Sequence, residues 1–165
     1  MDLETIVISL VIIIICIAPF AWMSIKNKRK EKRILQNLVD IAAKKNHKIN
    51  LHELWNNSII GMDSTNATVF YARNVKDNEA SHQINLAEVE KCRVINSSKM
   101  LSNQHGNSNI IDKLELGFLF QDKNKNEVVL EFYNATYDSL ILNTELQFVE
   151  KWCKLFNNKI LELGK

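Results

Sequence analysis

One uncharged run near the N-terminus constrains this sequence more than any other feature. Residues 6–25 read IVISLVIIIICIAPFAWMSI and contain no Asp, Glu, Lys or Arg. A helix rises about 1.5 Å per residue, so the run would span roughly 30 Å, which is the thickness of the hydrocarbon core of a bilayer. We therefore expect a transmembrane helix at residues 6–25, preceded by a short N-terminal tail at residues 1–5.

Two kinds of processed leader are alternatives to an uncleaved anchor. A secretory signal peptide begins with basic residues and has a shorter apolar core, whereas this chain begins with Asp2 and Glu4. A lipoprotein signal would place the lipid on Cys16, but the preceding position, where a small residue is needed, holds Ile15. The sequence therefore favours an anchor that is retained.

The charges that follow the run predict its orientation. Residues 26–48 hold nine Lys and Arg against two acidic residues, Glu31 and Asp40. The positive-inside rule places such a segment in the cytoplasm. We expect a single-pass protein of the inner (plasma) membrane, with its N-terminus outside and everything after residue 25 in the cytoplasm.

Six basic residues directly after the run are the candidate membrane-surface residues: Lys26, Lys28, Arg29, Lys30, Lys32 and Arg33. The favoured interpretation is that they only set the topology; recognition of anionic lipid head groups is the alternative. Nucleic-acid binding is disfavoured, because no aromatic residues are interleaved with the cluster and the rest of the chain is acidic overall.

Residues 28–45 show the periodicity of an amphipathic helix. Apolar residues recur at spacings of three and four, at Ile34, Leu35, Leu38, Val39, Ile41 and Ala42. This helix would fill most of a juxtamembrane segment at residues 26–49. Packing against the following domain is favoured, and a homodimer formed through the helix is the alternative.

The remaining residues, 50–165, are predicted to form one domain of class α+β. From residue 58 to residue 133 the apolar pattern has a period of two, which indicates short strands at 59–62, 68–73, 84–86, 92–94, 114–120 and 128–133. No helical pattern separates them, so we expect a small antiparallel β-barrel or sandwich. A short helical turn is expected at 51–55, and a polar loop at 96–109.

The C-terminal segment returns to a helical period. Its apolar positions step by three and four from Leu146 to Leu163, with a capping box at Thr144 and Gln147 and a stop at Gly164. Such a helix has to bury a wide apolar face. We expect it to cap one end of the barrel.

This order of segments resembles the pleckstrin-homology-like (PH-like, including GRAM-like) superfold. The matching segments are IIGMDS, TVFYAR, INLAEVEKCRVI, LELGFLF, VVLEFY and a final helix containing KWCKLFNNKI, whose Trp152 is a familiar feature of that family. The resemblance covers about residues 56–163. Within this superfold, the chain is similar to the membrane-anchored bacterial members. Eukaryotic relatives bind inositol lipids through a basic loop, but the matching loop here contains Asp63 and no basic residue before Arg73.

The sequence contains no recognisable catalytic, cofactor-binding or metal-binding set. His47, His52, His82 and His105 lack metal-ligand spacing, and no Cys-x-x-Cys pair occurs. Cys92 and Cys153 are expected to be buried, reduced and inert. Asp112, Glu115 and Glu131 could face one another across a sheet as catalytic carboxylates, but solvated strand faces are the favoured interpretation.

These features predict a non-enzymatic adaptor or scaffold domain that binds a protein partner at the cytoplasmic face of a membrane. Binding of a lipid or a small ligand by the PH-like domain is the alternative, and an enzyme ranks third. The polar segment 96–109 is either a loop that contacts the partner or a tolerated surface insertion.

Overall fold

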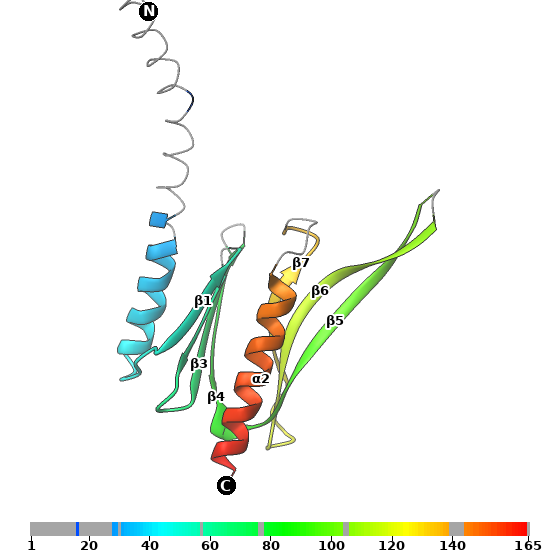
Figure 1. The fold of residues 1–165 in the computed structure, drawn as a ribbon. Coiled ribbons are helices and arrows are strands. Elements are labelled where there is room, and N and C mark those ends of the chain that lie inside the picture. Colours follow the sequence, from blue (N-terminus) through cyan, green and yellow to red (C-terminus); the bar gives the residue numbers. More distant parts are fainter. Residues whose placement is uncertain are drawn as a thin grey trace, which may run out of the picture.

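A computed structural model covers the whole chain and describes residues 16, 28–29, 31–56, 58–75, 78–103, 106–138 and 144–164. In this part of the chain, a helix at residues 31–43 is followed by seven strands in two antiparallel sheets and then by a long C-terminal helix (Figure 1).

The first sheet, sheet A, is formed by four strands in sequence order. They are β1 (Leu51–Trp55), β2 (Ser58–Asp63), β3 (Thr68–Val75) and β4 (Asn78–Asn85). Each strand pairs antiparallel with the next, so the connections are short turns. A short 3-10 helix, η1 (Leu86–Glu88), then leads the chain into the second sheet.

The second sheet, sheet B, has three strands: β5 (Val89–Asn103), β6 (Gly106–Phe120) and β7 (Val128–Asn134). β5 and β6 pair along almost their whole length, but β7 pairs with β6 only from Lys113 to Phe118. The outer parts of β5 and β6 therefore continue as a two-stranded ribbon that extends away from the body of the molecule (Figure 1).

The main core lies between the two sheets and the C-terminal helix, α2 (Glu145–Leu163). Val149, Trp152 and Phe156 of α2 are buried in this core, and the Phe156 ring lies 5.5 Å from that of Phe118 on β6. Their spacings of three and four place these side chains on one face of the helix. α2 thus lies along the opening between the sheets (Figure 1).

A smaller core lies on the opposite face of sheet A, beneath the helix at 31–43. Leu38 and Ala42 of this helix are buried against Ile59 of β2 and Phe70 of β3. Sheet A is therefore covered on both faces, which explains why every residue of β2 is buried and why its sequence does not alternate. The predicted packing of this helix on the following domain is confirmed.

The predicted transmembrane helix at residues 6–25 is not supported. Within the described ranges, no helix is both long enough and apolar enough to cross a bilayer, and the predicted span, apart from Cys16, lies outside those ranges. An apolar run measures only how well a segment would dissolve in lipid, and so does not establish a spanning helix. The predicted single-pass localisation in the inner membrane depended on this helix and is withdrawn with it.

The predicted fold class is also wrong in its barrel alternative, because the strands form two antiparallel sheets that are not closed. The boundary lies at η1, where the chain leaves β4 and begins β5 without pairing the two sheets edge to edge. Alternating apolar residues identify strands and their buried faces, but they carry no information on which edges pair.

Three local predictions are also corrected. Residues 51–55 form strand β1 rather than a helical turn, and the expected loop at 96–109 is largely the outer part of the β5–β6 ribbon. Thr144 precedes α2 but makes no side-chain capping hydrogen bond. Gly164 does end α2 as predicted, donating its N–H to the carbonyl of Ile160 at 3.0 Å.

The helix at 31–43 provides a test of the smaller core. Leu38 is 2% exposed, so Leu38→Ala should lower the free energy of unfolding by about 2–5 kcal/mol through the lost contacts and the cavity left behind. The adjacent Val39 is 41% exposed, and Val39→Ala should change it by less than about 0.5 kcal/mol. Urea denaturation of both variants measures the difference, and equal effects would contradict the packing of this helix on sheet A.

Candidate functional site

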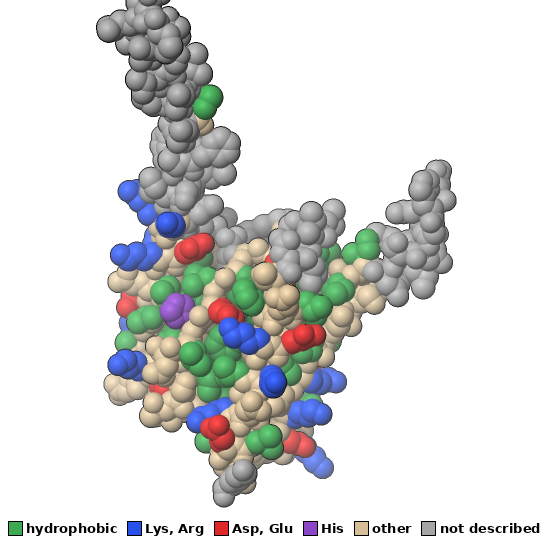
Figure 2. Space-filling model, in the orientation of Figure 1, with side chains coloured by type: hydrophobic (Ala, Val, Ile, Leu, Met, Phe, Trp, Pro, Cys, Tyr) green, Lys and Arg blue, Asp and Glu red, His purple; other side chains and the backbone are tan. Residues whose placement is uncertain are grey.

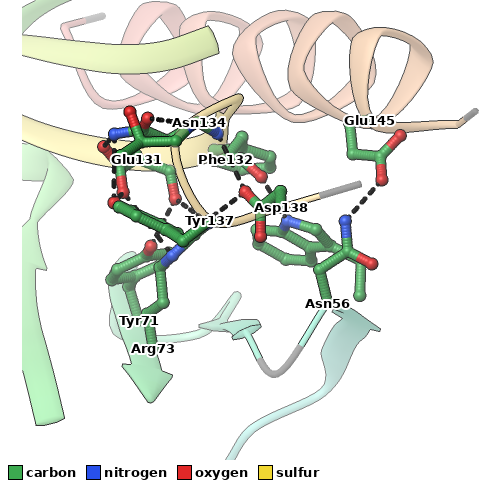
Figure 3. A network of polar contacts seen from close by, with 11 residues as sticks. Asn56, Tyr71, Arg73, Glu131, Phe132, Asn134, Tyr137, Asp138 and Glu145 are labelled. Carbon is green, nitrogen blue, oxygen red and sulfur yellow. Dashed lines mark hydrogen bonds and ion pairs between the residues drawn. The ribbon is translucent and has the colours of Figure 1, made fainter. Parts of the chain in front are cut away.

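A group of connected polar side chains lies where sheet A meets β7 of sheet B (Figure 3). Three donors from sheet A reach backbone carbonyls of β7. The Trp55 indole donates to the Phe132 carbonyl at 2.8 Å, and the Tyr71 hydroxyl and Arg73 Nη1 donate to the Glu131 carbonyl at 2.5 and 3.0 Å. We call this group, together with the turn after β7, the polar seam.

Arg73 is the central charge of the polar seam. Its side chain is 4% exposed, and Nη2 donates to the Asp138 carboxylate at 2.6 Å. Its Nε lies 3.6 Å from Glu131 Oε1, and the guanidinium lies 5.4 Å from the centre of the Tyr137 ring. A buried arginine is tolerated only with such partners, because an unpaired charge in the interior is very costly.

The turn after β7 is held by side chains of the same group. The Asn134 backbone N–H donates to Asp138 Oδ2 at 2.8 Å, and the Asn134 amide donates to Glu131 Oε2 at 2.7 Å and to the Tyr137 hydroxyl at 3.1 Å. Tyr137 also donates to Glu131. The turn is therefore fixed in the position that brings Asp138 to Arg73.

The electrostatics of the polar seam do not favour acid–base chemistry near neutral pH. Burial raises the pKa of Tyr71, and burial together with the hydrogen bond to Glu131 raises the pKa of Tyr137 to about 12. Burial opposes the charge of Arg73, but Tyr71, Asp138 and Glu131 outweigh it and raise the pKa further. A general acid or base works best with a pKa near the working pH, and the pKa of each of these three groups is moved further from neutrality.

The predicted membrane-surface residues lie apart from the polar seam. Lys28, Arg29, Lys32 and Arg33 are exposed and helical, while Lys26 and Lys30 fall outside the described residues. In Figure 2, basic side chains project from the molecule near the start of the 31–43 helix. Their predicted contact with a membrane depended on the unsupported transmembrane helix.

The three candidate carboxylates do not form one cluster. Glu115 and Glu131 are register partners on β6 and β7, but the Glu131 carboxylate is occupied by Asn134 and Tyr137 of the polar seam. Asp112 instead pairs with Lys99 at 2.8 Å. The described residues include no group of three or more His, Cys, Asp or Glu side chains placed to hold a metal.

His47 has a structural partner in Asp63. Its Nδ1 lies 3.0 Å from Asp63 Oδ2, and Asp63 also accepts from the backbone N–H groups of Lys48, Thr65 and Asn66 and from the Asn66 amide. The carboxylate thereby joins the segment after the 31–43 helix to the turn between β2 and β3. Burial would raise the pKa of Asp63, but these hydrogen bonds outweigh burial and lower it.

Sequence reasoning missed the polar seam. One signal was present: Val69, Tyr71 and Arg73 alternate along β3, so the arginine continues the face that Val69 and Tyr71 bury in the main core. An arginine on an otherwise buried face predicts a buried ion pair. The sequence does not reveal its partners, because Asp138 lies 65 residues away.

No protein-family model, no curated protein and no solved structure matches this chain. The assignment of a function therefore depends on the geometry alone.

The structural role of the polar seam can be tested by comparing two arginine substitutions, one inside the seam and one at the surface. Arg73→Ala leaves Asp138 buried without its cation, so the free energy of unfolding should fall by about 3–5 kcal/mol. The matched control is Arg93→Ala, which removes a solvent-exposed pair with Glu127 and should have little effect. Guanidinium denaturation measures both, and an Arg73 variant as stable as the control would contradict the role given to the seam.

The Asp63 hydrogen bonds predict a pH dependence. Because folding lowers the pKa of Asp63 below its ordinary value of 3.8, its contribution to stability is complete above about pH 5 and is lost as the pH falls through the folded-state pKa. Asp63→Asn should be less stable than the wild type at pH 7, and the gap should narrow from about pH 4 to pH 2. Urea denaturation at each pH measures the gap, which should stay constant above about pH 5; a gap that widens in acid would contradict the assignment.

Proposed function

We propose that this chain is a non-catalytic binding domain, which recognises an extended segment of a protein partner along the edge of its β5–β6 ribbon. The observation that carries the proposal is the length of the ribbon. β5 and β6 each have 15 residues, yet β7 covers β6 only between Lys113 and Phe118. Beyond that region each strand has one partner among the described elements, which is the other strand of the ribbon.

The outer ribbon offers what strand addition needs. A strand without a neighbour presents N–H and C=O groups that another extended chain can pair with. Proteins usually protect such an edge with several charges, a proline or a covering element. Residues 96–112 contain no proline, and their charged residues are Lys99 and Asp112, which pair with each other.

The ribbon also carries apolar side chains that can anchor a partner. Ile110 and Ile111 lie in its outer part, and Ile110 is 39% exposed. Main-chain pairing supplies affinity in this mode of recognition, and alternate side chains supply specificity. A protein segment with β-branched or other apolar residues at every second position fits this surface.

The polar seam supports the proposal that the rest of the described chain is non-catalytic. Its carboxylates, hydroxyls and guanidinium are engaged with one another between the two sheets rather than converging on a free position. A site of catalysis needs reactive groups directed at a substrate. The PH-like resemblance and the alternative of lipid or small-ligand binding remain predictions from the sequence.

Site-specific photo-cross-linking in the producing cells tests the proposal. A photoreactive amino acid at Lys99, on the ribbon, should give a discrete cross-linked product with one protein. The same group at Lys123, in the exposed turn between β6 and β7, is the matched control and should not give that product.

A peptide taken from the cross-linked segment of that protein should then slow amide exchange across residues 98–103 of β5. Equal cross-linking from both positions would contradict the proposal. Peptide binding that leaves the amides of the ribbon unprotected would contradict it as well.

A further inference from the structure

The edge of β5 nearest to α2 is closed by one asparagine side chain. The Cys92 backbone N–H donates to Asn157 Oδ1 at 2.9 Å, and Asn157 Nδ2 donates to the Cys92 carbonyl at 2.8 Å. An amide side chain thus pairs with this residue as a neighbouring strand would. These two hydrogen bonds fix the position of α2 along β5, at Cys92.

The same contact brings two cysteines together. Cys153 lies one helical turn before Asn157, and its Sγ is 3.5 Å from the Cys92 carbonyl and 3.5 Å from Asn157 Nδ2. Cys92 is buried, whereas Cys153 is only partly buried, and both are free thiols. Cys153 is therefore the more accessible of the two thiols, and its sulfur lies against the backbone of Cys92.

The surroundings favour the thiolate at Cys153 rather than at Cys92. A hydrogen bond from Cys92 lowers the pKa of Cys153 and outweighs its burial, while Asn157, the Val94 N–H and the nearby Lys91 act in the same direction. The hydrogen bond with Cys153 and burial raise the pKa of Cys92. A thiolate is the nucleophilic form of cysteine, so the more accessible sulfur is also the more reactive one.

We propose that Cys153 and Cys92 form a peroxide-reactive dithiol, in which Cys153 attacks the oxidant and Cys92 resolves the product into a disulfide joining α2 to β5. This assignment is independent of the function proposed for the ribbon. It differs from the sequence-based expectation that both cysteines are inert, because that expectation treated the strand and helix cysteines separately.

The reaction balances with a hydroperoxide as the oxidant. The Cys153 thiolate attacks the terminal oxygen, an S–O bond forms, the O–O bond breaks, and the alkoxide or hydroxide leaving group takes up a proton. Cys92 then attacks the Cys153 sulfur, which forms the S–S bond and breaks the S–O bond, and the Cys92 proton leaves with the hydroxide as water. Two thiols and one hydroperoxide give one disulfide, one alcohol or water, and one further water.

Oxidation of the full chain tests the proposal. With the exposed Cys16 replaced (Cys16→Ser), the reduced protein is treated with hydrogen peroxide and analysed by intact mass and by non-reducing digestion. The expected product has lost the mass of two hydrogen atoms and yields a linked peptide pair containing Cys92 and Cys153. Its denaturant midpoint should rise and should return to the original value with dithiothreitol.

Three variants assign the roles. In Cys92→Ser, Cys153 should stop at a sulfenic acid that dimedone traps, and in Cys153→Ser, Cys92 should not react in the folded protein. Asn157→Ala should slow disulfide formation about ten- to a hundredfold by releasing α2 from β5. The matched control is the exposed neighbour Asn158→Ala, which should keep the original rate.

Two results would overturn the proposal. One is a product that only gains oxygen on Cys153 and never forms the linked peptide, and the other is a disulfide that forms only in denaturant.

Discussion

The fold depends on side chains that hydrogen-bond to the backbone carbonyls of β7 in place of a neighbouring strand. Sheet A and sheet B are separate, and Trp55, Tyr71 and Arg73 join them by donating to Glu131 and Phe132. A buried carbonyl without a donor is costly, so these contacts satisfy an edge and join two sheets at once. The charge that this arrangement buries at Arg73 is acceptable only because the turn after β7 supplies a carboxylate.

The opening between the two sheets has to be covered, and α2 covers it. Trp152 is buried in the core while its indole donates to Glu53 of β1 at 2.5 Å, and the neighbouring Lys151 pairs with the same carboxylate. At its other side α2 is held to β5 by Asn157. The helix is therefore attached to both sheets by directional contacts, and its apolar face fills the space between them.

The sequence predicts those parts of the fold in which burial follows a regular period. The strand containing Leu114, Leu116 and Phe118 and the helix containing Trp152 and Phe156 were identified because one face of each is apolar and buried. The sequence predicts a loop where the outer ribbon lies, because polar strands outside the core carry no such pattern. The seam and the cysteine pair were missed because their partners lie more than 55 residues apart, and periodicity describes only local structure.

At both edges of sheet B near the core, side chains form hydrogen bonds with backbone groups of the edge strand. Arg73, Tyr71 and Trp55 occupy carbonyls of β7, and the amide of Asn157 occupies both backbone groups of Cys92 on β5. Strand addition to sheet B in these regions would first have to displace buried or partly buried side chains. In the outer ribbon, the side chains of Lys99 and Asp112 pair with each other at an exposed position. These contacts near the core thus favour the ribbon as the place where the proposed partner segment pairs with sheet B.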